Sequence, residues 1–97
     1  MSRDRSNAYR RVMKTLEDMG PSKLLDNEQQ RIRCAADNLI FSTDLNSDIE
    51  AREALEDVEM LCRALVQTGR WEHFAATRLA DDVFHCGPVG PLVVQAA

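Results

Sequence analysis

Apolar and polar residues recur with helical periodicity in four segments, and this pattern predicts four amphipathic helices. In the first two segments, residues 6–19 and 27–42, apolar side chains return every three or four positions. The predicted apolar stripes are Tyr9, Val12, Met13, Leu16 and Met19 in the first segment, and Ile32, Ala35, Ala36, Leu39 and Ile40 in the second.

The third predicted helix begins at Ser47 and ends at Gly69, and the fourth covers residues 71–86. Only a few residues around Gly69 separate them, so the two are expected to form an antiparallel αα-hairpin. Their predicted stripes are Ala51, Ala54, Leu55, Val58, Leu61, Cys62 and Leu65 in the third, and Trp71, Phe74, Ala75, Leu79, Val83 and Cys86 in the fourth.

Local sequence signals predict where these helices begin and end. Gly20-Pro21 is expected to stop the first helix, because glycine suits a left-handed C-terminal position and proline cannot continue a helix. Asp26 with Gln29 is a variant of the capping box, and Ser47 with Glu50 is a full one. We therefore expect the second and third helices to begin directly after Asp26 and Ser47.

Together these elements predict an all-α fold, a small four-helix and mostly antiparallel bundle. The composition agrees, since Ala and Leu supply 21 residues and the strand-favouring Val and Ile only 10. We expect one helical domain over residues 1–88 and a flexible tail over residues 89–97 that either stays loose or docks in a groove. The alternative is a three-helix core whose first helix swaps onto a partner chain.

The net charge, the hydrophobicity pattern and the cysteine content indicate in which cellular compartment the protein is expected. The 97 residues carry a net charge of −4, with no apolar run long enough to cross a membrane and no secretory signal at the start. Cys34, Cys62 and Cys86 are odd in number and far apart, which disfavours a disulfide framework. We expect a cytoplasmic protein with reduced thiols that does not contact a membrane.

Catalysis and metal binding have little support. His85 and Cys86 are adjacent, but neighbouring residues on a helix point about 100° apart and do not form a pair. No two cysteines are close enough for the paired ligands of a zinc site. The carboxylates of residues 48–59 read as a solvated helix face with Arg52–Glu56 and Glu59–Arg63 pairs. We predict neither an enzyme nor a metal or cofactor site, and keep a thiol or metal sensor as the weakest alternative.

The start of the chain is basic. Residues 1–15 carry a local charge of +4, and a basic helix with an aromatic residue can bind nucleic acid. The fourth helix contains Asp81 and Asp82, which argues against groove reading. A nucleic-acid-associated regulator is therefore an alternative of low rank. Its contact residues would be Arg5, Arg10, Arg11 and Lys14.

Several apolar residues fall outside the predicted stripes, on sides of the helices that should face water. Cys34 and Phe41 do so in the second helix, Ile49 and Met60 in the third, and Ala76, Ala80 and Phe84 in the fourth. Exposed apolar patches mark partner sites. We predict a non-catalytic regulator, adaptor or assembly factor that binds a protein of unknown identity and self-associates. The predicted contact residues are Phe41, Ile49, Met60, Trp71 and Phe84, with Trp71 alternatively a core plug.

Overall fold

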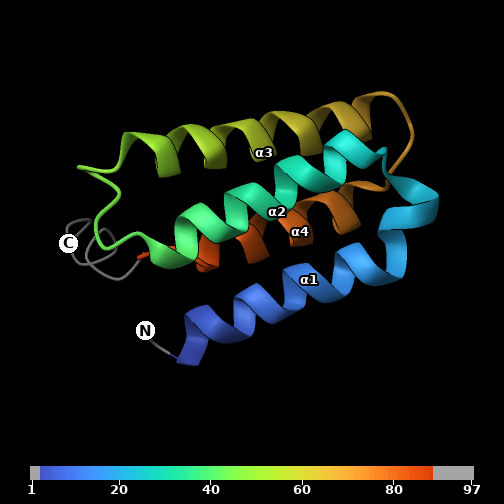
Figure 1. Cartoon of the computed structure of the whole chain (residues 1–97). Coiled ribbons are helices and arrows are strands. Elements are labelled where there is room, and N and C mark those ends of the chain that lie inside the picture. The colour runs from blue at the N-terminus through green and yellow to red at the C-terminus, as the bar shows by residue number, and fades with distance from the viewer. Residues whose placement is uncertain (1–2, 89–97) are drawn as a thin grey trace.

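The computed structural model describes residues 3–88, apart from the side chains of residues 20 and 21. Within that range it contains four helices and no strand, and successive helices run in opposite directions (Figure 1). The predicted all-α four-helix bundle and its αα-hairpin are confirmed. The predicted tail, residues 89–97, lies outside the described range. The helices are α1 (Arg3–Lys23), α2 (Asp26–Phe41), α3 (Ile49–Gln67) and α4 (His73–His85).

The four helices are not equivalent in the bundle. The α2 and α4 helices contact each other and also both remaining helices, whereas α1 and α3 touch only α2 and α4 and not one another. The first helix packs within its own chain, so the arrangement with a swapped first helix is not the one observed. As a result, α1 and α3 form opposite flanks of the bundle, each with an outer side that no other helix in residues 3–88 covers.

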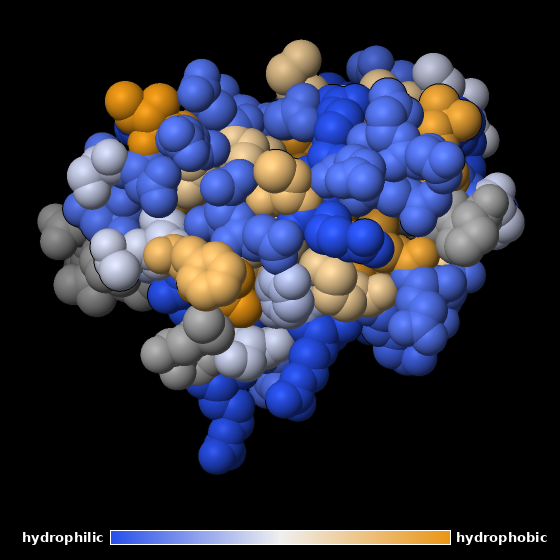
Figure 2. Space-filling model, in the orientation of Figure 1, coloured by the Kyte–Doolittle hydropathy of each residue, from blue (hydrophilic) through white to orange (hydrophobic). Residues whose placement is uncertain are grey.

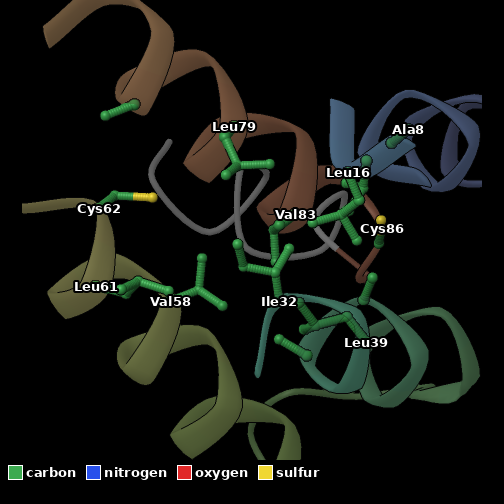
Figure 3. Packing of buried hydrophobic residues seen from close by; sticks show 14 of the residues in the cluster. Ala8, Leu16, Ile32, Leu39, Val58, Leu61, Cys62, Leu79, Val83 and Cys86 are labelled. Carbon is green, nitrogen blue, oxygen red and sulfur yellow. The ribbon is translucent and has the colours of Figure 1, made fainter. Parts of the chain in front are cut away.

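The core is built from the inward stripes of all four helices (Figure 3). Every predicted stripe residue of the second helix is buried, and the predicted stripe of the third is buried or half-buried. Ile32, Leu39, Val58, Leu79 and Val83 lie at its centre with at most 1% of their surface exposed. Burying a side chain of this size stabilises the fold by about 1.5–3 kcal/mol.

Side-chain hydrogen bonds and ion pairs connect neighbouring helices at the edges of the core. The Tyr9 hydroxyl donates to Asp37 Oδ1 at 2.6 Å, and this hydrogen bond raises the pKa of Tyr9. Within residues 3–88, neither of the expected Arg52–Glu56 and Glu59–Arg63 pairs is formed. The ion pairs between helices are instead Arg11–Asp82, which joins α1 to α4, and Arg31–Asp57, which joins α2 to α3.

The predicted end of the first helix is wrong. The α1 helix continues past Gly20 and Pro21 and ends at Lys23. Tertiary contacts hold this last turn: the Lys23 carbonyl accepts hydrogen bonds from Arg70 and from the indole of Trp71, and Leu24 is buried in the core. These contacts outweigh the local preference of a Gly-Pro pair to end a helix.

Both predicted cap positions are displaced by one residue, the first towards the N-terminus and the second towards the C-terminus. At the start of α2, Glu28 Oε1 accepts the backbone N–H of Leu25 at 2.8 Å, so Leu25 and not Asp26 is the cap. At the start of α3 the cap is Asp48, whose Oδ1 accepts the N–H of Ala51 at 3.0 Å. Ser47 instead hydrogen-bonds back to Asp44 in the preceding loop.

The turn between α3 and α4 agrees with its prediction. Gly69 has a φ of +76°, a conformation that favours glycine. The N–H of Gly69 donates to Val66, and the N–H of Arg70 donates to Leu65, both at 3.0 Å. These two bonds form a Schellman motif that ends α3 and turns the chain into the hairpin.

The predicted face of the fourth helix is partly wrong. Helix α4 begins at His73, two residues later than expected, and Phe74 is 74% exposed instead of buried. Ala76, which was expected on the outside, is buried. Trp71 precedes the helix and is buried in the core from the connecting turn, whereas Phe74, in the first turn of α4, faces outward.

Candidate functional site

Five large apolar side chains are exposed within the described part of the chain. On the face viewed in Figure 2, apolar groups appear as separate orange areas within a mostly blue surface. Three of the five are residues that the sequence predicted as partner contacts, Phe41, Ile49 and Met60, with 77%, 59% and 65% of their surface exposed. The remaining two, which the sequence analysis did not single out as contacts, are Leu25 and Phe74.

Phe41 and Ile49 are brought together at one end of the bundle. Phe41 is the last residue of α2 and Ile49 the first of α3, and residues 42–48 connect the two helices (Figure 1). This connection is well fixed, because Leu45 is buried and the Asp44 carbonyl accepts the N–H groups of Ser47 and Asp48. The loop therefore holds two exposed apolar side chains at neighbouring helix ends.

Met60 lies on the same outer side of α3, further along the helix. Eleven residues separate it from Ile49, a spacing that returns to the same helix face after three turns, about 16 Å away. Glu53 and Glu56 lie on this face between the two apolar residues and are exposed. We call Ile49, Glu53, Glu56 and Met60 the α3 outer stripe.

The two remaining predicted contacts are not exposed in this way. Trp71 is buried, with 6% of its surface exposed, and its indole N–H donates to the Lys23 carbonyl at 3.2 Å. It is the core plug and not a surface anchor, which corrects its place among the contacts. Phe84 is half-buried, and its ring meets that of His85 edge to face at 5.5 Å.

Phe74 borders a hollow that the sequence analysis missed. The hollow lies over the outer side of α4, has a volume of about 540 Å³, and is also lined by His73, Arg78, Asp81 and His85. Its lining mixes cations with carboxylates and has no single charge. The sequence could have revealed the exposure of Phe74 only through the start of α4. Trp71 and Phe74 are three residues apart and fit one apolar stripe equally well, so the stripe alone does not show which of them is buried.

The basic first helix uses much of its charge internally. The Arg5 guanidinium donates to the carbonyl oxygens of Leu39, Ile40, Ser42 and Cys86 at 2.7–3.1 Å. These oxygens belong to the C-terminal ends of α2 and α4, where helix dipoles favour a cation. The other three predicted nucleic-acid contacts are Arg11, which pairs with Asp82, Lys14, which pairs with Asp18, and Arg10, which is exposed.

The thiols and histidines do not combine into a reactive pair. Cys86 is buried, and burial raises its pKa to about 11, as it does for Cys62. His85 is exposed, and its Nδ1 lies 2.6 Å from the Asp81 carbonyl oxygen, four residues earlier in the same helix. Cys34 is exposed on α2. Among the described residues, no three potential ligands gather into a metal-binding group.

At the opposite end of the bundle from Phe41, an ion pair acts structurally. Arg70 binds both carboxylate oxygens of Glu28, at 2.8 and 2.9 Å, and also reaches the Lys23 carbonyl. Hydrogen bonding to Arg70 lowers the pKa of Glu28 from its usual value, against the opposing effect of burial. Arg70 thus joins the α3–α4 turn to the junction of α1 and α2.

The fold and surface define a class, a small all-α bundle with exposed apolar side chains on α2 and α3. None of the helices in the described part of the chain is both long and apolar enough to span a membrane. A scan against protein-family models gives no match, and searches of curated proteins and of solved structures return no similar chain. The surface itself therefore provides the grounds for a functional proposal.

Proposed function

We propose that this chain is a non-catalytic protein-interaction module that binds a protein partner through Phe41, Ile49 and Met60. The supporting observation is the exposure of these three large apolar side chains on two packed helices, between 59% and 77% each. Removing apolar surface from water is the main driving force of protein association. Large exposed aromatic and thioether side chains are enriched at interfaces.

A second copy of the chain is the alternative occupant of this surface. Self-association would bury the same three side chains, so it does not require another site. The nucleic-acid alternative receives less support, because Arg5 is hydrogen-bonded to helix ends, while Arg11 and Lys14 pair with carboxylates. We therefore place protein binding first.

The proposal is tested by affinity capture of the tagged chain from a native lysate, with and without nuclease. We expect a partner that is captured in both arms and is lost with Phe41→Gln/Met60→Gln. Both side chains are exposed, so circular dichroism should show unchanged helicity. Leu25→Gln is the matched control, because Leu25 is 60% exposed at the other end of the bundle.

Three results would count against protein binding at this surface. Capture that disappears with nuclease would favour nucleic acid instead. Capture reduced equally by Leu25→Gln would mean that general hydrophobicity causes it. Recovery of the chain alone, with a dimer or larger species in sedimentation velocity, would assign the surface to self-association.

A further inference from the structure

No other described helix covers the outer side of α3. Within residues 3–88, helix α3 packs only on α2 and α4, so the side opposite its buried stripe has no neighbouring helix. The α3 outer stripe lies there, with Ile49 and Met60 at its two ends and Glu53 and Glu56 between them. These positions follow the spacing i, i+4, i+7 and i+11 of one helix face.

The stripe is acidic as well as apolar. Neither Glu53 nor Glu56 takes part in an ion pair within residues 3–88. Glu50 and Glu59 are also exposed on α3, and so are Arg52 and Arg63, so four exposed carboxylates against two guanidinium groups leave this side of the helix net negative. A surface of this kind favours a partner that brings positive charges between two apolar contacts.

A second copy of the chain is a poor match for this surface. In a two-fold antiparallel contact that packs Ile49 of one copy against Met60 of the other, Glu53 of each copy would face Glu56 of its partner copy, and like charges in an interface are unfavourable. The α1 helix offers the exposed cations Arg3 and Arg10, but no large apolar side chain is exposed on it. Neither pairing satisfies both the charges and the apolar ends of the stripe.

We propose that the α3 outer stripe binds a cationic amphipathic helix of another protein. Such a helix would place two apolar side chains about 16 Å apart against Ile49 and Met60, and two Lys or Arg side chains against Glu53 and Glu56. Apolar burial supplies the affinity, and the charges speed encounter and set the register. This inference rests on the proposed function and names the chemistry of the partner.

The test uses a fluorescein-labelled model peptide of leucine and lysine with helical apolar spacing, followed by fluorescence anisotropy. We expect saturable binding that weakens with added salt, because the charges of the stripe are exposed. Glu53→Lys/Glu56→Lys should raise the Kd at least about tenfold, which corresponds to about 1.4 kcal/mol. The same peptide with glutamate in place of lysine should not bind.

A matched pair of single variants separates the stripe from general charge. Glu56→Lys and Glu17→Lys both exchange an exposed glutamate in a helix, and both change the net charge by the same amount. Only Glu56→Lys should weaken peptide binding. Equal weakening by Glu17→Lys, equal binding of the glutamate peptide, or no binding of the lysine peptide would each overturn the inference.

Failure of the cationic-helix inference can be distinguished from failure of the proposed protein-binding function. If Phe41→Gln/Met60→Gln abolishes partner capture while Glu53→Lys/Glu56→Lys leaves it intact, the surface binds protein but the partner is not cationic. If sedimentation shows a dimer that is lost with Arg10→Glu, a second copy occupies the stripe through α1. Either result rejects the cationic helix and leaves the other conclusions standing.

Discussion

At one end of the bundle an arginine donates to several backbone carbonyl oxygens, and at the other end an arginine binds a carboxylate. At the Arg5 end, one guanidinium joins the ends of α2 and α4 to α1. At the Arg70 end, the guanidinium binds Glu28, which in turn accepts the N–H of Leu25. Both clamps use a guanidinium, but the Glu28 carboxylate titrates in acid, whereas the carbonyl oxygens that accept from Arg5 do not titrate.

The two ends of the bundle differ in what they combine with the arginine: one carries exposed apolar side chains, and the other closes the core. The Arg5 end holds helix termini rigidly and also carries the exposed Phe41 and Ile49. The Arg70 end adds the buried Trp71 and closes the core. A surface that binds a partner benefits from a rigid base, since an ordered site loses less entropy on association.

The largest expected effect is at the Arg5 end. Arg5→Ala leaves several carbonyl oxygens at the ends of α2 and α4 without their charged donor. We expect the free energy of unfolding to fall by about 3 kcal/mol, because a hydrogen bond to a charged donor contributes about 1.5–3 kcal/mol and Arg5 makes several partly buried ones. Urea unfolding followed by circular dichroism measures it. Arg10→Ala, at an exposed position of the same helix, should stay within about 0.5 kcal/mol of the parent chain.

A smaller, pH-dependent effect is expected at the Arg70 end. Arg70 lowers the pKa of Glu28, so the stability from this pair is present above the pKa of the unfolded chain and is lost as pH falls through the lower folded pKa. Glu28→Gln should cost about 1 kcal/mol at pH 7, since the partially exposed Arg70 weakens the pair.

That cost should shrink in acid. At pH 3 the difference between Glu28→Gln and the parent chain is expected to be smaller, whereas the part of the Arg5→Ala cost that comes from its bonds to carbonyl oxygens should stay constant because neither guanidinium nor carbonyl titrates there. Urea unfolding of both variants at pH 7 and pH 3 measures this contrast. Equal pH dependence of the two variants would show that the clamps do not differ as described.

The smallest expected effect has the opposite sign. Ser42 is 3% exposed, and its hydroxyl oxygen is buried without a hydrogen-bond partner among the described residues, while its carbonyl accepts Arg5. Ser42→Ala removes this hydroxyl and keeps the carbonyl, so stability should rise by about 0.5–1 kcal/mol. Thermal unfolding measures the gain. Ser22→Ala, at an exposed position, is the control and should change little.

The apolar stripes were predictable because a helix buried on one side needs an apolar residue every three or four positions, and this spacing is visible in the sequence. This worked fully for α2, whose stripe from Ile32 to Ile40 is entirely buried. It failed at Trp71 and Phe74, because two aromatic residues three positions apart fit one stripe and only the packed turn decides between them. The helix end at Lys23 was missed for a related reason, since contacts from Arg70 and Trp71 override the Gly-Pro signal.

The candidate site was partly predictable for the same reason. Phe41, Ile49 and Met60 lie opposite the buried stripes of their helices, and the structure places all three outside. Phe84 fell on a wider inward arc and is half-buried. The role of Arg5 could not be predicted, because a basic residue in a first turn is typical of a solvated face, and its acceptors lie 34 to 81 residues away in the chain.

Those long separations have a consequence for the order of events in folding. The αα-hairpin of α3 and α4 needs only local contacts and can form early. The Arg5 hydrogen bonds require the start of α1 and the ends of α2 and α4 to be packed already, so we expect them to form after the main barrier. Interactions absent from the transition state control the unfolding rate and leave the folding rate nearly unchanged. We therefore expect Arg5 to govern how long the assembled bundle persists before it opens.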